Sequence, residues 1–198
     1  MIRIKKLISG ITIACCLAMV AGCSSGHSDK IEQKPLTQED GTVSFDALYF
    51  TDGERTITDL MGKNAYEKFR KMVKDDSTFN GDINGNDFLG FMIDNSDGTE
   101  VAAISFNDDK ILFQLTISPN YSLPDGTICI PEFSLSGVTL QDSYDDVVNT
   151  LGKPTEETVD NEGNVESIQY DAPDSSYVYI GFGDSQVDYI AVVGNDGT

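Results

Sequence analysis

Positive charge is scarce in this chain. Its 198 residues include 13 Lys and Arg against 33 Asp and Glu, and the formal net charge is −20. Nucleic-acid binding needs clustered cations that contact phosphates, so this balance excludes a nucleic-acid-binding protein. Tryptophan is absent, which weakens the case for an aromatic platform that binds sugars. With 39% hydrophobic residues, the chain still has enough apolar side chains to fold.

Histidine and cysteine, the residue types of many catalytic and metal sites, are also few. His27 is the only histidine, which excludes a catalytic triad or a zinc site built on several positioned imidazoles. Two of the four cysteines lie in an N-terminal apolar segment, and the others are Cys23 and Cys129. We therefore expect no disulfide within the folded part. Flanked by Ile128 and Ile130, Cys129 is predicted to be a small buried hydrophobic residue.

The one long hydrophobic run falls short of a membrane span. Arg3, Lys5 and Lys6 precede an apolar segment from Leu7 to Ala21. This segment has about 15 residues, whereas a membrane-spanning helix needs roughly 20. Basic residues followed by a short apolar run are typical of a secretory signal, so residues 1–22 are predicted to be a signal peptide. A permanent transmembrane anchor is the alternative.

The end of this segment, Val20-Ala21-Gly22-Cys23, resembles the lipobox of bacterial lipoproteins. The resemblance implies cleavage before Cys23 and lipidation of its thiol, with acyl chains such as palmitate. It places the protein at the extracytoplasmic face of the cell membrane, anchored by lipid. The alternative is a plain signal peptide with an incidental cysteine. Residues 23–42, polar and without apolar periodicity, are predicted to be a lipidated tether.

A helix followed by three strands is predicted in the second half of the chain. The spacing i, i+3, i+4 and i+7 places four apolar residues on one helical face: Tyr144, Val147, Val148 and Leu151. Ser143 and Asp146 have the spacing of a capping box, and Gly152 is typical of a helix end. Three apolar runs with short connections predict antiparallel strands at Val165–Asp171, Ser176–Phe182 and Val187–Val193.

The first half repeats this order of elements at an offset of about 77 residues. A helix is predicted from Tyr66, Phe69, Met72 and Val73, with Asn64 as its cap. The strands are predicted at Phe88–Ile93, Glu100–Phe106 and Ile111–Ile117. We therefore predict an α+β fold of two tandem units, 43–120 and 121–198, each with an N-terminal helical segment packed on a three-stranded antiparallel sheet. The alternative is a single larger α+β domain with accidental spacing.

Residues 137–155 resemble the opening helix of modules similar to the β-lactamase inhibitory protein and to the outer-membrane assembly lipoprotein BamE (SmpA/OmlA). Tandem copies behind a lipobox resemble a group of Gram-positive lipoproteins. The first half departs from this motif. Met61-Gly62-Lys63-Asn64 matches it only poorly, and no Leu-Gly-Lys-Pro sequence, as at residues 151–154, follows the first predicted helix. The resemblance implies the fold and the location. It also implies that an open, concave sheet is the recognition surface.

The last strands place tyrosines on the predicted open face of the sheet. Val178, Ile180 and Phe182 alternate toward the helix, so Tyr177 and Tyr179 lie on the opposite face, and Tyr189 is predicted to join them. Rigid amphipathic rings on an open face are typical of a binding hot spot. The alternative is that the other half of the chain covers these tyrosines.

Basic residues cluster on the first predicted helix. The cluster comprises Lys63, Lys68, Arg70, Lys71 and Lys74. One interpretation is a solvated helix face, in which Glu67 and Lys71 form an i,i+4 ion pair. The other is a docking helix for an acidic partner or for wall polymer.

Acidic residues offer two further candidate sites. Asp82–Asp87 alternates oxygen ligands as a calcium loop does, but Gly85 stands at position 4 and Ile93 replaces the bidentate Glu. A turn at Asn84-Gly85 is therefore predicted, and no metal or cofactor is expected. Paired carboxylates offer acid–base chemistry at Asp108/Asp109, Asp145/Asp146 and Glu156/Glu157.

These observations predict a lipid-anchored extracytoplasmic binding module. Its partner is predicted to be a surface or wall-associated protein, recognised through the open sheet face, with membrane contact only through the lipid anchor. The alternative is a cell-wall hydrolase, or a glycan- or peptide-binding accessory protein, that uses paired carboxylates. A hydrolase predicts two carboxyl groups that face each other across a cleft, at least one with a raised pKa.

Overall fold

The structure, a computed structural model, describes residues 31, 33–73, 78–83 and 86–195. The chain divides into two compact units, Met1–Ile31 and Glu32–Thr198, and the fold described here is that of the second. The predicted signal peptide, the lipidation site Cys23, His27 and the Asn84-Gly85 turn lie outside the described residues. Neither helix of the described part is long and apolar enough to cross a membrane.

The described elements are two eight-residue helices and eleven strands, so the fold is mostly β. The helices are α1 (Ala65–Met72) and α2 (Tyr144–Leu151). A large sheet contains β3 (Thr78–Ile83), β4 (Asn86–Asp94), β5 (Glu100–Phe106), β6 (Leu112–Pro119), β8 (Glu156–Val159), β9 (Val165–Asp171), β10 (Tyr177–Gly183) and β11 (Gln186–Val193). A small sheet contains β1 (Tyr49–Thr51), β2 (Thr56–Thr58) and β7 (Ser134–Leu135).

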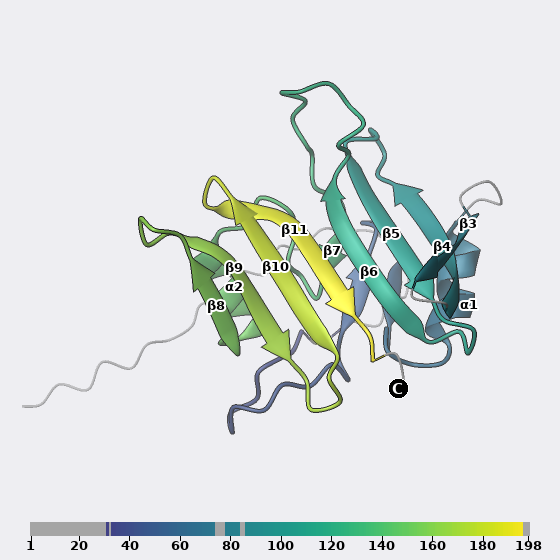
Figure 1. The fold of residues 1–198 in the computed structure, drawn as a ribbon, viewed down its shortest axis with the longest axis horizontal. Helices are drawn as coiled ribbons and strands as arrows, with labels where there is room; N and C mark the ends of the chain where they lie inside the picture. Colours follow the sequence, from purple (N-terminus) through teal and green to yellow (C-terminus); the bar gives the residue numbers. More distant parts are fainter. Residues whose placement is uncertain (1–30, 32, 74–77, 84–85, 196–198) are drawn as a thin grey trace, which may run out of the picture. The chain divides into compact units, whose positions relative to one another are not determined.

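The large sheet has eight strands in the order β3-β4-β5-β6-β11-β10-β9-β8, and every neighbouring pair is antiparallel (Figure 1). Each half of the chain contributes four consecutive strands. The halves meet where β6 pairs with β11, from Ile117 opposite Ile190 to Gln114 opposite Val193. The prediction of two tandem helix-on-sheet units is therefore wrong. If each half formed a separate sheet, the edge strands β6 and β11 would leave backbone N–H and C=O groups unpaired. Hydrogen bonding between these two strands joins both halves into one sheet.

The six predicted strands of the large sheet form close to their predicted bounds, whereas five further strands were not predicted. Apolar runs separated by turn-like segments predict the six. Strand β8 carries no such pattern, since all four of its residues are exposed. Strands β1 and β2 have only three residues each and β7 has two, too few for a periodicity.

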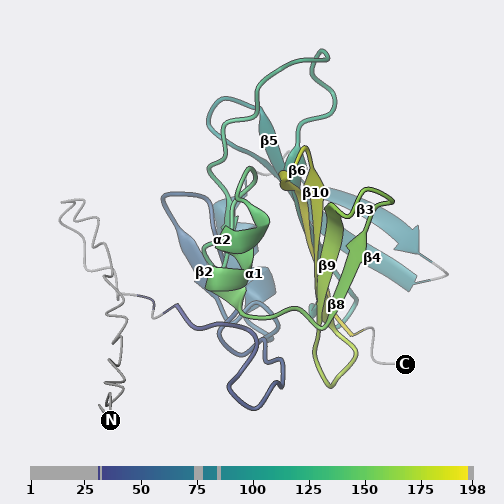
Figure 2. The same cartoon turned by 90° about the vertical axis from the view of Figure 1, so that its left-hand side faces the viewer.

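Both helices and the small sheet lie against the same face of the large sheet (Figure 2). Ring contacts mark this interface: Phe69 of α1 lies 5.9 Å from Phe106 of β5, and Tyr144 of α2 lies 6.1 Å from Phe182 of β10, between ring centroids. Phe50 of β1 contacts Phe69 at 5.5 Å. The hydrophobic core therefore lies on one side of the large sheet.

The ends of α2 form as predicted, whereas the start of α1 does not. The Asp146 amide donates to the Ser143 hydroxyl at 3.2 Å and the Ser143 amide donates to the Asp146 carboxylate at 3.2 Å, which confirms the capping box. Gly152 ends α2 with φ +88°. Asn64 occupies the N-cap of α1, but its side chain makes no capping hydrogen bond.

Part of the segment predicted to be a tether packs on the fold. Leu36 is 1% exposed and belongs to the core. The amides of Leu36 and Thr37 donate to the Leu151 carbonyl at 2.8 and 3.1 Å, which satisfies an acceptor at the end of α2. A single leucine among polar residues has no periodicity, so the sequence pattern does not reveal this packing. The domain boundaries in general stay predictions.

Candidate binding face

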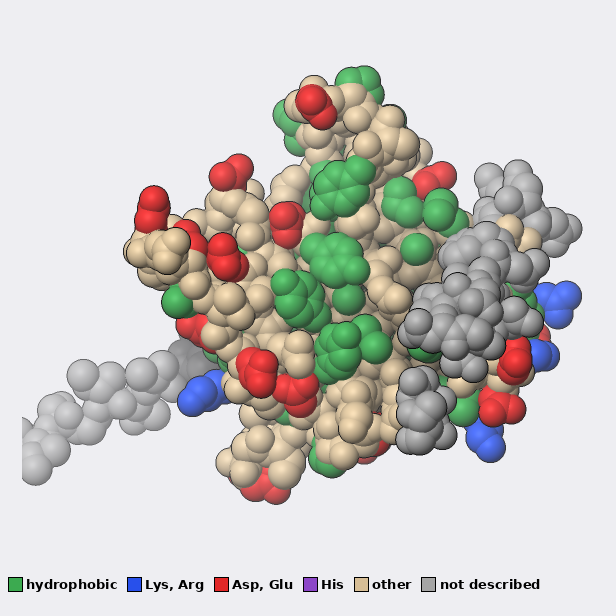
Figure 3. Space-filling view, viewed as in Figure 1, with side chains coloured by type: hydrophobic (Ala, Val, Ile, Leu, Met, Phe, Trp, Pro, Cys, Tyr) green, Lys and Arg blue, Asp and Glu red, His purple; other side chains and the backbone are tan. Residues whose placement is uncertain are grey.

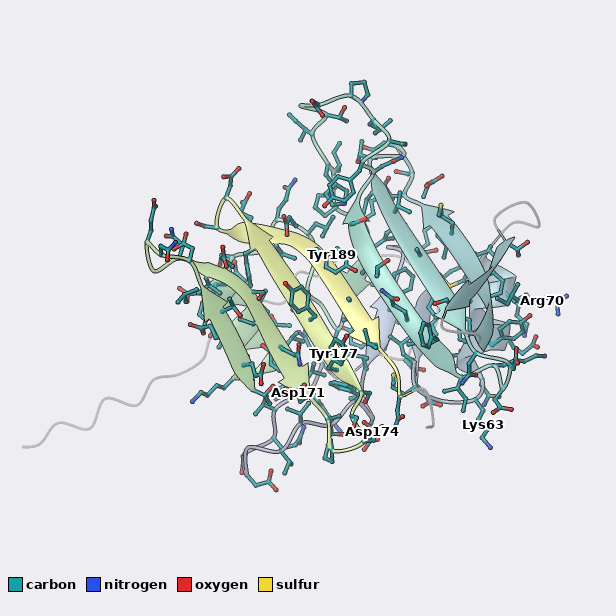
Figure 4. The ribbon with its side chains drawn as sticks, viewed as in Figure 1. Lys63, Arg70, Asp171, Asp174, Tyr177 and Tyr189 are labelled. Carbon is teal, nitrogen blue, oxygen red and sulfur yellow. The ribbon has the colours of Figure 1, made fainter. Side chains whose placement is uncertain are left out.

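The face of the large sheet opposite the helices carries the three predicted tyrosines. Val178 and Ile180 are fully buried, whereas Tyr177 and Tyr179 are half-buried on the other side of β10. Tyr189 lies beside them on β11, with its ring centroid 6.2 Å from that of Tyr179 and the rings at 66°. Figure 4 shows Tyr177 and Tyr189 on the same side of the sheet. Tyr177, Tyr179 and Tyr189 with the surrounding surface of β10 and β11 form the tyrosine face.

A glycine and a β-bulge lie beside the tyrosine pair. Gly181 pairs with Tyr189 across the strands, and a Cβ added to Gly181 would lie 3.3 Å from the Asp188 Oδ1 and in ordinary contact, at 3.6 Å, with Tyr179 and Tyr189. The register shifts between Gly181 and Phe182, which places Asp188 as an extra exposed residue beside Tyr189. The bulge therefore adds a carboxylate at the end of the tyrosine cluster.

Small side chains continue the tyrosine face across the middle of the sheet. Tyr179 pairs with Ala191, Ala191 with Thr116, Thr116 with Ala103, and Ala103 with Met92 of β4. Met92 is 48% exposed. Hydrophobic side chains gather over the middle strands in the space-filling view (Figure 3). The tyrosine face is thus a continuous, mainly apolar surface over several strands.

The hydroxyl groups of Tyr189 and Tyr121 remain protonated near neutral pH, because the pKa of each is raised. Burial raises the pKa of Tyr189, and nearby Tyr177 and Tyr179 add to this, whereas a hydrogen bond with the Gln114 side chain lowers it. The pKa of Tyr121, which follows β6, is raised by partial loss of solvent around the phenol and then by the charge of Asp188 and by Tyr189, although most of the side chain is exposed. Protonated hydroxyls can donate hydrogen bonds to a ligand.

The charges around the tyrosine face are negative. Lys153 is the only Lys or Arg after residue 110, while Asp and Glu recur throughout that half. Asp171 pairs with Tyr177 across β9 and β10, and Asp188 flanks Tyr189. In Figure 3 acidic groups border the central hydrophobic surface, and Lys and Arg lie toward the edges of the view. The tyrosine face therefore has a negative potential.

The predicted basic helix lies apart from the tyrosine face, because α1 packs on the opposite side of the sheet (Figure 2). The Lys68 ammonium donates to the Thr58 carbonyl at 2.6 Å. The predicted Glu67–Lys71 pair is wrong, because Glu67 lies 3.9 Å from Lys110 instead. Arg70 and Lys71 are exposed, as is Lys63. Lys74 lies outside the described residues.

Two residues of the predicted carboxylate pairs have structural roles. Asp146 belongs to the capping box, and the carboxylate of Glu157 accepts a hydrogen bond from the Tyr144 hydroxyl at 2.7 Å. Glu156 and Glu157 are successive residues of β8, so their side chains point to opposite faces. In the described part of the chain, no group of three His, Cys, Asp or Glu residues has a metal-binding arrangement. The segment of the calcium alternative includes residues outside that part.

Cys129 differs from its predicted setting. It packs against the core but is partly exposed, and the flanking Ile128 and Ile130 are 78% and 57% exposed. Burial, reinforced by the nearby carboxyl of Glu100, raises the pKa of the thiol to about 11. The thiol is therefore protonated at neutral pH, and a protonated thiol is a poor nucleophile.

Sequence reasoning missed Glu100, the most unusual titratable group in the structure. Its side chain is fully buried, and Oε2 accepts hydrogen bonds from the amides of Glu132 and Phe133 at 2.7 and 2.8 Å. Its other oxygen has no partner in the described part of the structure. Burial raises its pKa to about 7, against the lowering effect of these two amides. A glutamate that begins a strand gives no sequence signal of burial.

Comparison with protein-family models, curated proteins and solved structures finds no match.

Proposed function

We propose that the chain is a lipid-anchored extracytoplasmic binding module that recognises a surface or wall-associated protein through the tyrosine face. The observation that carries this proposal is the row of half-buried tyrosines, Tyr177, Tyr179 and Tyr189, on a sheet face that no other described element covers. Tyrosine side chains offer large contact area and a polar tip, and they lose little entropy on binding.

The arrangement of the two halves supports an accessible face. Coverage of the tyrosines by the other half would require the halves to stack. Instead, β6 and β11 pair edge to edge, so the strands of the first half extend the tyrosine face sideways. The location rests on the lipobox-like residues that end at Cys23. The role of an open sheet as the recognition surface agrees with the resemblance to inhibitor-like modules.

The observed carboxylates support binding over the hydrolase alternative. A glycoside hydrolase uses two carboxyl groups at the substrate, one of them with a raised pKa. Among the residues that the structure describes, the carboxyl group with a clearly raised pKa is that of Glu100, at about 7, and its side chain has no exposed surface. A polymer substrate cannot reach an oxygen atom in that position.

The proposal is tested by capture of partners from a native cell-surface extract. The bait is the full lipidated chain in detergent micelles, compared with its Tyr177→Ala/Tyr179→Ala double variant. Val159→Ala is the matched control, because Val159 is 51% exposed on the edge strand β8, away from the tyrosines. Circular dichroism melting establishes that each variant is folded.

We expect a protein that is captured by the wild type and by Val159→Ala and is lost with the double variant. Equal capture by the folded double variant would refute recognition through the tyrosine face. Capture that is instead lost after Lys68→Glu/Lys71→Glu would assign the interface to the basic helix.

A further inference from the structure

The loop at residues 120–133, between β6 and β7, concentrates exposed hydrophobic side chains. Tyr121, Ile128 and Ile130 are 73%, 78% and 57% exposed. In Figure 1 this loop rises beyond the ends of β5 and β6. Apolar side chains gathered on one projecting loop are costly in water and mark interaction sites.

The base of this loop is held firmly on the β4–β5 hairpin. The Asn95 side chain donates to the Ile130 carbonyl at 2.8 Å, and the Ile130 amide donates to the Thr99 hydroxyl at 3.0 Å. The buried Glu100 carboxylate accepts from the amides of the last two residues of the loop. At the start of the loop, Asn120 donates through its side chain to the Gly98 carbonyl at 2.8 Å. The exposed hydrophobic residues therefore sit on an anchored frame, which reduces the entropy lost on binding.

The loop is continuous with the tyrosine face. Strand β6, which leads into the loop, pairs with β11 at Ile117 opposite Ile190, the residue after Tyr189. The pKa of Tyr121 is accordingly raised in part by the charge of Asp188 and by Tyr189. Tyr189 in turn contacts Tyr179 edge to face. Aromatic side chains thus lie on β10, on β11 and at the start of the loop that follows β6. The acidic Asp188 lies beside them, and Asp125 is exposed within the loop.

We propose that the 120–133 loop forms, with the tyrosine face, one recognition surface, and that this surface binds a positively charged segment of a partner protein. This inference rests on the proposed function and adds the chemistry of the partner. Charge complementarity supports a basic partner segment. Residues 111–198 contain Lys153 as their only Lys or Arg, and the surface includes Asp171 and Asp188. Lys and Arg side chains can pair with these carboxylates and lie over tyrosine rings.

The test uses two fluorescent heptapeptides, one of alternating lysine and leucine and one of alternating glutamate and leucine. Each is titrated against the full lipidated chain in micelles at several salt concentrations. We expect the lysine peptide to bind and the glutamate peptide not to bind. Tyr121→Ala should lower the affinity for the lysine peptide about fivefold or more, as truncation of a hot-spot tyrosine does. Asp188→Asn should weaken it and reduce the salt dependence.

The Val159→Ala variant serves again as the control and should bind like the wild type. Loss of binding in Tyr177→Ala/Tyr179→Ala with unchanged binding in Tyr121→Ala would overturn the role of the loop and leave the proposed function standing. Equal binding of the two peptides, or failure of the lysine peptide to bind the wild type, would overturn the assignment of a basic partner. Unchanged binding in both tyrosine variants would contradict the proposed function as well.

Discussion

The carboxylate of Glu100 accepts a hydrogen bond from the backbone amide of Phe133, 2.8 Å away, although the Glu100 side chain is fully buried. Glu132 and Asp97 lie close enough for their negative charges to raise the Glu100 pKa further. The 120–133 loop is thus anchored to β5 by a carboxyl group whose charged form is disfavoured by its surroundings.

Stability is therefore expected to fall as pH rises toward neutrality. The pKa of Glu100 is raised from 4.5 to about 7 in the folded chain. Below the unfolded pKa, Glu100 is protonated in both states and its contribution to the free energy of unfolding is fully present. This contribution is lost as pH rises through the folded pKa, which lowers the free energy of unfolding by up to about 3 kcal/mol. Glu100→Gln keeps an oxygen for the two amides and removes the charge. We expect this variant to melt at a higher temperature than the wild type at pH 8 and at a similar temperature at pH 5.

The control for this prediction is Glu156→Gln, which neutralises an exposed carboxylate on the edge strand β8. It should leave the difference between pH 5 and pH 8 unchanged. A lower melting temperature of Glu100→Gln at pH 8 would show that the charged carboxylate stabilises the loop.

Gly152 is expected to resist replacement by alanine. Its backbone has φ +88° and ψ −171°, a region that residues with a Cβ avoid. A Cβ there would also lie 3.0 Å from the Thr37 Cβ and 3.3 Å from the Thr37 carbonyl oxygen. Gly152→Ala should lower the free energy of unfolding by about 2–4 kcal/mol in urea titrations.

Gly163→Ala is the control that separates the cost of the positive φ from the cost of the contact with Thr37. Gly163 also has φ +88°, but no atom lies within 4 Å of an added Cβ. This variant should lose only about 1 kcal/mol. Equal losses in the two variants would mean that the contact with Thr37 contributes nothing.

The capping box of α2 should matter more than the N-cap of α1. Ser143→Ala removes the hydroxyl that accepts from the Asp146 amide, at an expected cost of about 1 kcal/mol. Asn64→Ala removes a side chain that makes no capping hydrogen bond and should have little effect. Urea titrations of both variants check this order, and an equal loss in both would refute it.

The fold is expected to depend on Leu36, within the segment predicted to be a tether. Leu36→Ala leaves a cavity in the core and should cost about 2–5 kcal/mol. Glu39→Ala, at an exposed position nearby, is the control and should leave the thermal unfolding curve unchanged. If the thermal unfolding curve of Leu36→Ala coincided with that of the wild type, Leu36 would not stabilise the fold and the segment would be a tether, as the sequence predicts.

Local sequence patterns were reliable for the longer elements that have one buried face. The alternation of Val178 and Ile180 with Tyr177 and Tyr179 predicted β10 and the side on which the tyrosines lie, because a strand turns alternate residues to opposite faces. The Ser143–Asp146 spacing predicted the start of α2, since capping depends on neighbouring residues only. The same local reasoning placed a Glu67–Lys71 pair on α1, but Lys110 reaches Glu67 from the β5–β6 turn.

Contacts between distant residues escaped these patterns. The Leu36 amide bonds to Leu151, and Glu100 binds the amides of residues 132 and 133, in pairs that the chain brings together only on folding. Tyr121 comes near Asp188 and Tyr189 for the same reason, because it follows β6 and β6 pairs with β11. No periodicity records such contacts, because each depends on the packing of elements that are far apart in the sequence.

The sequence by itself determined the charge, the position of most strands of the large sheet, both helices and the side of β10 that carries tyrosines. These properties follow from composition and from the fixed geometry of helices and strands. Tertiary structure alone decided that β6 and β11 join the two halves into one eight-stranded sheet. Edge pairing depends on which backbone groups remain unsatisfied once each half has folded, and side-chain patterns carry no information about that choice.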